Sequence, residues 1–298
     1  MAGETDIADE TRARKVRKLL QVQPGSLDLT KIDPASTPGL PTGRPDNAKA
    51  WSKSEVIRLG AQIGTHHARL YAAAATGAAR WRVLLVLQAM DCGGKDGTVK
   101  SVVGAMDPLG VRITAFGPPT PDELARHFLW RIHAALPPVG FFGVFNRSHY
   151  EDVLAVRVRK LVPKSVWSRR YDEINGFEKV QADDGMTIVK VMLHISKQEQ
   201  AERLMARLDD PAKRWKFSPG DIEDRERWDA YQAAYTDALN RCSTRQAPWY
   251  VVPADRKWYR NWAVANILLA HLAEFKADYP PADFDVEAQR EALKANGR

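Results

Sequence analysis

The sequence contains little cysteine and no long apolar run, and each shortage excludes a class of protein. Cys92 and Cys242 are the only cysteines among 298 residues, too few for a disulfide framework and without metal-binding spacing. No stretch approaches the roughly 18 apolar residues of a membrane-spanning helix. The polar start, Met-Ala-Gly-Glu-Thr-Asp, lacks the apolar core of a signal peptide. We therefore expect a cytoplasmic protein without a membrane partner.

Acidic residues are fewer than basic ones. Lysine and arginine number 44 against 37 aspartate and glutamate, which gives a net charge of +7. This excess favours an anionic partner such as a nucleotide, polyphosphate or nucleic acid, without choosing among them. The hydrophobic fraction of 44% and the length suit one large α/β domain or two small ones.

The chain divides into three parts by composition. Residues 1–50 form an N-terminal extension, with a basic helix predicted at 11–21 and an irregular segment rich in proline and glycine at 33–46. Residues 51–278 form the main domain, and residues 279–298 form a C-terminal tail. The basic side chains of the first helix fit a solvated helix face better than an anion site.

Strand and helix patterns alternate through the main domain. Strands are predicted at 82–88, 111–116, 140–145, 186–195 and 249–252. Helices are predicted at 52–77, 121–136, 153–161, 196–208, 228–242 and 258–277. Capping boxes are expected at Ser52 with Glu55 and at Thr120 with Glu123. The alternation predicts a parallel sheet covered on both faces, which binds ligands at the carboxyl ends of its strands.

The most informative motif is Ala89-Met-Asp-Cys-Gly-Gly-Lys-Asp-Gly-Thr98, between the first strand and a helix. Glycines allow backbone N–H groups to converge on an anion, and the lysine and the helix N-terminus add positive charge. A standard P-loop, or Walker A motif, would have glycine at Ala89 and a hydroxyl at Asp96. The residues expected to contact phosphate are Gly93, Gly94, Lys95, Asp96, Gly97, Thr98 and Lys100. Because Asp91 would repel phosphate, we expect Mg²⁺ between them.

A second motif, Phe145-Asn-Arg-Ser-His-Tyr-Glu-Asp-Val153, follows the third strand. Arg147 can clamp a phosphate, although a structural salt bridge is the alternative. Glu151 and Asp152 can hold a metal ion, whereas Glu151 can also serve a capping box with Ser148. His149 lacks a histidine or cysteine neighbour for zinc, so it is expected to be packed and hydrogen-bonded.

A third motif is a basic cluster that follows the fourth strand. Its members are Arg203, Arg207, Lys213, Arg214 and Lys216, interleaved with Trp215, Phe217 and Pro219. We predict that residues 200–225, here called the lid segment, close over transferring phosphates. A solvated charge run and a nucleic-acid patch are the alternatives, and nucleic acid is the less favoured.

Together, Asp91–Gly97, Phe145–Asp152 and Asp210–Pro219 resemble the polyphosphate kinase family 2 over roughly residues 50–275. The resemblance implies a three-layer P-loop kinase fold with a five-stranded, mainly parallel sheet, similar to thymidylate kinase and with a helical lid. It implies an enzyme that uses inorganic polyphosphate as donor and nucleotides as acceptors, with Mg²⁺, or Mn²⁺ as a substitute. It also implies a homodimer or homotetramer.

By the same resemblance, the catalytic residues are Asp91, Lys95, Arg147 and Arg207. Asp91 is linked to the metal, Lys95 and Arg147 bind phosphate, and Arg207 belongs to the lid. Many family members have aspartate where this chain has Asn146, which moves the expected metal role toward Asp152. The motif is similar to that of a subgroup accepting both nucleoside mono- and diphosphates.

Two other functions stay open from the residues alone. An ATP-dependent nucleoside monophosphate kinase would share the loop but would need an adenine pocket for its donor. A non-catalytic protein that binds polyanions or nucleic acid would have no use for Asp91 beside Lys95. The net charge of +7 favours a polyphosphate donor over ATP.

Overall fold

A parallel sheet forms the centre of the fold, as predicted. The computed structural model describes residues 2–42, 47–78 and 80–296. The strands of this part are β1 Arg82–Ala89, β2 Val111–Ala115, β3 Phe142–Asn146, β4 Met186–His194 and β5 Trp249–Pro253. All four pairings are parallel, in the order β2-β3-β1-β4-β5. The apolar run of β1 is buried because this strand lies in the middle of the sheet.

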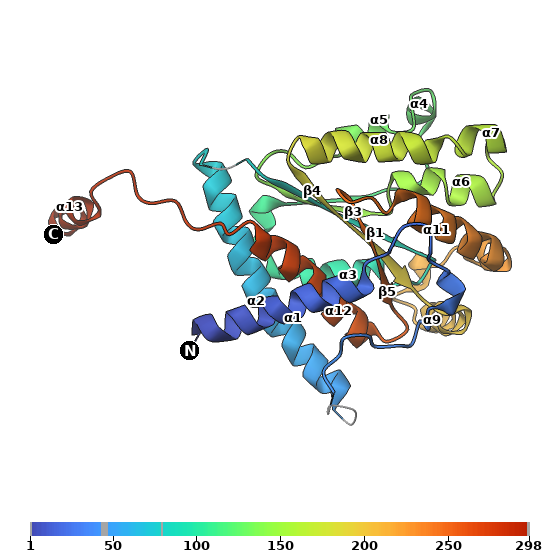
Figure 1. Cartoon of the computed structure of the whole chain (residues 1–298), viewed down its shortest axis with the longest axis horizontal. Helices are drawn as coiled ribbons and strands as arrows, with labels where there is room; N and C mark the ends of the chain where they lie inside the picture. The colour runs from blue at the N-terminus through green and yellow to red at the C-terminus, as the bar shows by residue number, and fades with distance from the viewer. Residues whose placement is uncertain (1, 43–46, 79, 297–298) are drawn as a thin grey trace.

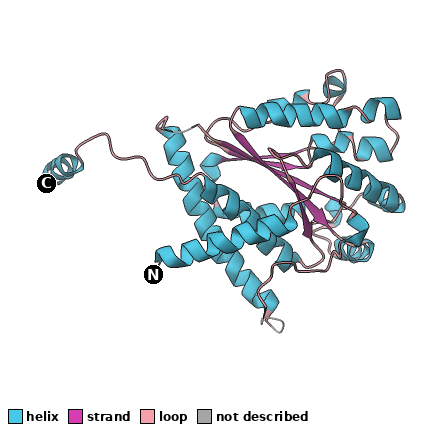
Figure 2. Cartoon of the chain, in the orientation of Figure 1, coloured by secondary structure: helices cyan, strands magenta, loops and turns pink. Residues whose placement is uncertain are grey.

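Helices cover both faces of the sheet and produce the three expected layers (Figures 1 and 2). One face carries α2 Ala48–Ala75, α3 Lys95–Val102 and α12 Lys257–Glu274, with α1 Ala2–Leu20 packed on α12. The other face carries α6 Ala155–Val158, α8 Arg170–Asp183 and α11 Trp228–Cys242. None of the helices in the described ranges is both long and apolar enough to cross a membrane.

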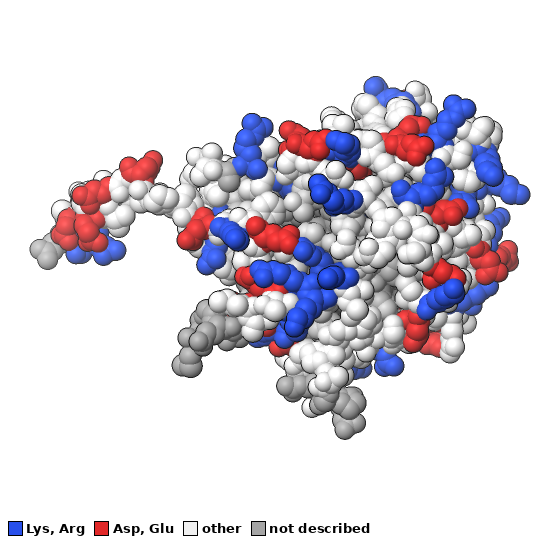
Figure 3. All heavy atoms as spheres, in the orientation of Figure 1, with Lys and Arg blue, Asp and Glu red and all other residues white. Residues whose placement is uncertain are grey.

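The N-terminal helix is longer than predicted and belongs to the packed body. Val16 and Leu20 on α1 are buried in the core. Among its basic residues, Arg12 pairs with Glu55 and Arg17 pairs with Glu274. Figure 3 shows basic side chains gathered over this helix. Two arginines of this basic face therefore link α1 to α2 and to α12 through ion pairs.

Two helices differ from the sequence prediction, one in where it begins and the other in its length. The helix α2 begins at Ala48, and Ser52 lies inside it, where its hydroxyl donates to the Trp258 carbonyl oxygen at 3.0 Å. Tertiary contact with α12 thus replaces the expected capping box. The box at Thr120 is confirmed, but the helix that it starts ends at Leu124, and farther on the Leu129 N–H donates to His127 Nδ1 at 3.4 Å. The predicted helix is split into α4 Pro121–Leu124 and α5 Trp130–Ala134.

The structure also differs from the prediction between the strands, where one helix is shorter than predicted and others were not predicted. The helix predicted at 153–161 is reduced to α6. A set of helices was missed: α7 Lys164–Trp167, α8, α10 Pro219–Glu226 and α13 Val286–Asn296. Short 3₁₀ turns lie at Leu29–Lys31, Val103–Ala105, Pro108–Gly110, His149–Asp152 and Arg214–Lys216. The helix α9 Lys197–Asp209 is capped as predicted by Ser196, whose side chain accepts the Glu199 N–H. The helix α13 lies apart from the body (Figure 1).

Candidate active site

The loop after β1 is shaped by glycines at two positions. A Cβ atom on Gly93 would lie 2.3 Å from the Ala89 Cβ, so the alanine that departs from the P-loop pattern makes Gly93 necessary. Gly94 has a φ of +101°, and a Cβ there would lie 1.8 Å from Arg260 Nη1. Cys92 also adopts a left-handed φ of +62°. This backbone directs the loop toward the N-terminus of α3, where an anion is favoured.

Lys95 stands at the start of α3, half-buried in the loop. Its Nζ donates to the Ala89 carbonyl oxygen at 3.1 Å. Burial and the neighbouring Arg147 lower the pKa of Lys95, whereas Asp91 and Glu151 oppose that shift. A bound phosphate would favour the charged lysine further, because it adds negative charge at short range.

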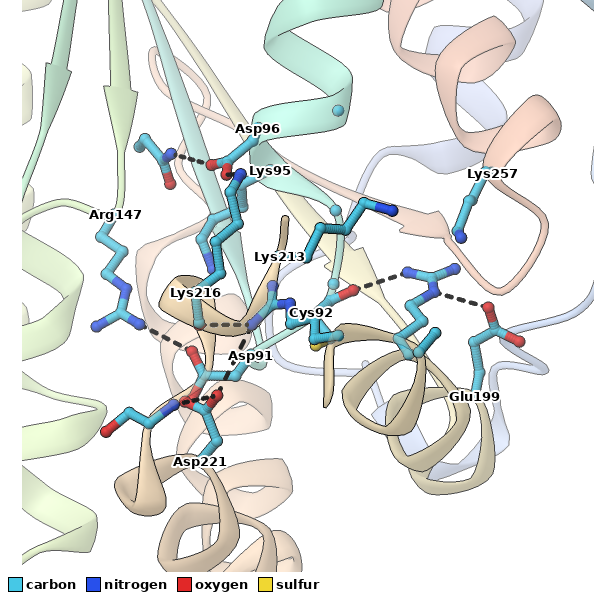
Figure 4. Close-up of a pocket in the computed structure, with 18 of the residues that line it drawn as sticks. Asp91, Cys92, Lys95, Asp96, Arg147, Glu199, Lys213, Lys216, Asp221 and Lys257 are labelled. Atoms are coloured by element: carbon cyan, nitrogen blue, oxygen red, sulfur yellow. Dashed lines mark hydrogen bonds and ion pairs between the residues drawn. The ribbon is translucent and has the colours of Figure 1, made fainter. Parts of the chain in front are cut away.

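Arg147 joins the second motif to the first. It follows β3 in a left-handed conformation (φ +64°), and its N–H donates to the Leu87 carbonyl oxygen at 3.1 Å. Its Nη2 donates to Asp91 Oδ1 at 2.8 Å, and Figure 4 shows the guanidinium turned toward that carboxylate. Burial lowers the pKa of Arg147, but nearby Glu151 and Asp91 outweigh burial and raise it overall. The salt bridge that was the alternative to a phosphate clamp therefore exists, and its partner is itself a predicted site residue.

A cleft of about 850 Å³ opens over this loop (Figure 4). The predicted residues that line it are Asp91, Gly93, Gly94, Lys95, Asp96, Gly97, Arg147, Arg207, Lys213 and Lys216. Three predicted phosphate contacts do not line it: Thr98, Lys100 and Arg214. Thr98 is buried with its hydroxyl donating to the Gly94 carbonyl oxygen, and Lys100 is exposed on α3. The cleft thus brings together parts of all three motifs.

A smaller cavity of about 170 Å³ lies beside the cleft and shares Asp91, Phe116 and Arg147 with it. Glu151 and Asp152 line this smaller cavity and not the cleft. Burial raises the pKa of Glu151, although Arg147 and Lys95 oppose the shift. Asp152 accepts a hydrogen bond from Arg170 Nη1 at 2.8 Å, so one of its oxygens already has a cationic partner.

The lid segment touches the loop through Asp96. Asp96 Oδ2 pairs with Lys216 Nζ at 3.0 Å, and Asp96 Oδ1 accepts from Asn146 Nδ2 at 2.8 Å. Burial raises the pKa of Asp96, but these two hydrogen bonds outweigh it and lower the pKa overall. An aspartate at position 146 could not donate this bond when ionised. In the same segment, Arg207 lies 3.7 Å from Asp221 and donates to the Lys216 carbonyl oxygen.

The sequence interpretation missed a cationic wall on the opposite side of the loop. Lys257 and Arg260 of α12 line the cleft beside Arg203, and Figure 4 shows Lys257 across the cleft from Arg147. Arg260 is only 3% exposed, and Asn261 Oδ1 accepts from its Nε and Nη2. Burial and then the nearby Arg203 lower the pKa of Arg260 to about 10. No local pattern marks these residues, because α12 reaches the loop only through the tertiary fold.

Comparisons with known proteins place the chain among polyphosphate phosphotransferases. The family described as polyphosphate kinase 2 (PPK2) matches residues 59–280. An AMP/ADP-polyphosphate phosphotransferase of Meiothermus ruber is 48% identical over 264 residues, covering 88% of this chain and 95% of the relative. An ADP-polyphosphate phosphotransferase of Rhodopseudomonas palustris is 42% identical over 213 residues, covering 67% of this chain and 74% of the relative.

The solved structures give the same result for the fold. The crystal structure of polyphosphate kinase 2 from Arthrobacter aurescens has a TM-score of 0.88 and 46% identity, and the match covers 94% of this chain and 96% of that one. The predicted P-loop kinase architecture is thereby confirmed. Because the family match spans most of the main domain and these relatives align over most of their length, this chain belongs to the polyphosphate kinase 2 family.

Proposed function

We propose that this chain transfers the terminal phosphoryl group of inorganic polyphosphate to a nucleoside mono- or diphosphate. The observation that carries the proposal is that Asp91 and Arg147 line both the large cleft and the small cavity. A reaction between two anionic substrates needs such a cationic group at the point where they meet. The M. ruber and R. palustris relatives are polyphosphate phosphotransferases, which supports the same reaction.

The large cleft fits the donor, and the small cavity fits one part of the acceptor, because about 170 Å³ is below the roughly 300 Å³ or more of a pocket that encloses a whole ligand. The cleft contains lysines and arginines from the loop, the lid segment and α12, as a long polyanion requires. The small cavity adds apolar and aromatic side chains to its charged ones, among them Pro118, Leu154 and Tyr235. Such a lining suits a nucleotide, which carries a flat base as well as phosphates.

The residues fit a divalent cation that substrate oxygens help to hold. The described residues contain no group of three His, Cys, Asp or Glu side chains arranged to hold a metal ion alone. Mg²⁺ is usually bound by one or two carboxylates together with phosphates and water. We assign Asp91 to this role, with Glu151 as the second carboxylate, since both line the acceptor cavity. Asp152 lines the same cavity and is the third candidate carboxylate; it accepts from Arg170 as Asp91 accepts from Arg147. The bound cation would neutralise phosphate charge.

The chain's own residues then perform the transfer by positioning and charge neutralisation. The attacking group is an ionised phosphate oxygen, so no general base is needed. Lys95 and the loop N–H groups hold the donor, and Arg147 stabilises the negative charge of the phosphoryl group during its transfer. Arg207 and Lys216 enclose the reaction from the lid segment and exclude water. Product is the acceptor extended by one phosphate and a donor shortened by one.

The deciding experiment is an assay with AMP, ADP, GMP and GDP as separate acceptors. We expect nucleotide products from polyphosphate with Mg²⁺ and none without a divalent cation. ATP replaces polyphosphate as donor in a parallel reaction with AMP or GMP. Transfer from ATP but not from polyphosphate would identify a nucleoside monophosphate kinase. Binding of polyphosphate without any product would identify a non-catalytic protein.

Arg260 of the cationic wall gives a prediction about the KM for the polyphosphate donor alone. Arg260→Met is expected to raise the KM for polyphosphate about tenfold without changing the KM for the nucleotide, because Arg260 lines the cleft but not the small cavity. The matched control is Arg256→Met, since Arg256 lies one turn earlier and donates to the Ala35 carbonyl oxygen outside the cleft. Donor titrations at two salt concentrations measure both effects. An unchanged donor KM would remove Arg260 from the donor path.

A further inference from the structure

A buried charged cluster lies under the turn that carries Arg147 and Glu151. Lys190 of β4 and Glu178 of α8 are 0% and 1% exposed, and their Nζ and Oε2 atoms are 2.5 Å apart. Lys190 Nζ also donates to the Tyr150 hydroxyl at 2.8 Å and to the Cys242 carbonyl oxygen at 2.7 Å. All three ammonium hydrogens therefore have an acceptor.

The same cluster holds two consecutive residues of the second motif. The Tyr150 hydroxyl donates to Glu178 Oε1 at 2.9 Å, and His149 Nε2 lies 3.1 Å from the same oxygen. Burial raises the pKa of Glu178, but Lys190 and His149 outweigh it, so the net pKa is lowered. The carboxylate is thus ionised at neutral pH and receives hydrogen bonds on both of its oxygens.

The 3₁₀ turn His149–Asp152 has different surroundings on its two sides. His149 and Tyr150 are buried in the cluster, whereas Glu151 and Arg147 line the small cavity. The turn begins at Ser148, whose side chain accepts the Tyr150 N–H. One peptide unit joins Tyr150 to Glu151 and three join it to Arg147, so the cluster holds the short backbone segment that carries both site residues.

We infer that Glu178 and Lys190 are positioning residues, which act through Tyr150 and His149 to fix Arg147 and Glu151 in the phosphoryl site. This inference rests on the proposed function. Stability alone is a weak reason for such a cluster, because buried ion pairs can often be replaced by apolar residues of similar volume at no loss. Positioning of the site residues is a stronger reason for the cluster, since a misplacement of a catalytic group by about 1 Å can cost about 10²-fold in rate.

The primary test compares two tyrosines. Tyr150→Phe removes the hydroxyl that links the turn to the cluster, and it is expected to lower kcat about tenfold with little change in either KM. Tyr250→Phe is the matched control, because its hydroxyl is equally buried and lies 2.9 Å from His271 Nε2, on β5 and α12. Tyr250→Phe is expected to leave kcat unchanged. Both proteins are assayed well below their measured melting temperatures, so that loss of folded protein does not contribute.

A double-mutant cycle with Arg147→Ala separates positioning from a general structural role. Because Arg147 is one of the two site residues that the cluster fixes, Tyr150→Phe should lower kcat clearly less in the Arg147→Ala background than in the wild-type protein. Additive effects in this cycle, or equal kcat for Tyr150→Phe and Tyr250→Phe, would overturn the inference while the proposed function stands. Glu178→Gln, where it folds, is expected to repeat the loss of kcat. A folded wild-type protein without transfer activity would overturn the proposed function, and the inference with it.

Discussion

Lys95→Met is expected to lower kcat by about 10³-fold while the protein keeps its fold. Loss of one preorganised donor to a developing charge typically costs about 10²- to 10³-fold. Lys95 also lies among several charged neighbours, since Arg147, Asp91 and Glu151 all influence its pKa, so we expect the upper end of that range. Methionine preserves most of the side-chain length. The measurement is initial-rate kinetics under saturating donor and acceptor, with circular dichroism to verify folding.

The control for Lys95→Met is Lys31→Met. Lys31 is exposed and pairs with Asp28 at 3.6 Å, far along the chain from the loop and outside both cavities. Its loss is expected to change kcat less than twofold. Near wild-type turnover in folded Lys95→Met protein would contradict the assigned role of the loop, even if polyphosphate still bound to the cleft.

Four of the five described strands were predictable because each is a short, mostly apolar run in the buried part of the sheet, whereas β2 lies at the edge and is largely exposed. Val83–Leu87 within β1 illustrates this, since every one of these side chains is at most 1% exposed. The helix α8 was missed because its apolar positions are few and its buried residues include Glu178 and Gln181. The partners of Glu178 are His149, Tyr150 and Lys190, which lie at least 12 positions away, so no local pattern indicates its burial.

The candidate site was predictable where one loop supplies consecutive residues, and less so where separate elements meet. Asp91, Lys95 and Arg147 come together as the motifs indicate. Arg260 was missed because only the packing of α12 brings it to Gly94. The carboxylate of Asp152 was predicted near the metal, yet the position of Arg170 on α8 could not be foreseen.

Several cations of the cleft have acidic partners from the chain itself. Asp91 pairs with Arg147, Asp96 with Lys216, and Glu199 with Arg203. Arg260 differs, since its hydrogen bonds go to a neutral asparagine. Such pairs keep cationic side chains extended toward the cleft in the free protein. Phosphate oxygens can then compete with these carboxylates for the same donors.

Arg147→Ala is expected to reduce kcat by about 10³-fold or more, since arginines that stabilise transferring phosphoryl groups contribute about 10³- to 10⁵-fold. The guanidinium lies between donor cleft and acceptor cavity, and its removal also leaves Asp91 without its 2.8 Å partner. Because the missing charge acts mainly on the reacting group, kcat should fall more than either KM rises. Arg147→Lys should recover only part of the loss, because lysine keeps the charge but not the forked geometry.

Arg82→Ala is the matched control for Arg147→Ala. Arg82 also pairs with an aspartate, Asp184, but at the opposite end of β1 from the loop. Its loss should leave kcat unchanged, although the melting temperature can fall slightly, as expected for the loss of a surface ion pair. If both arginine variants kept wild-type turnover, the phosphoryl group would have to be transferred elsewhere, and the point shared by the two cavities would not be the reaction centre.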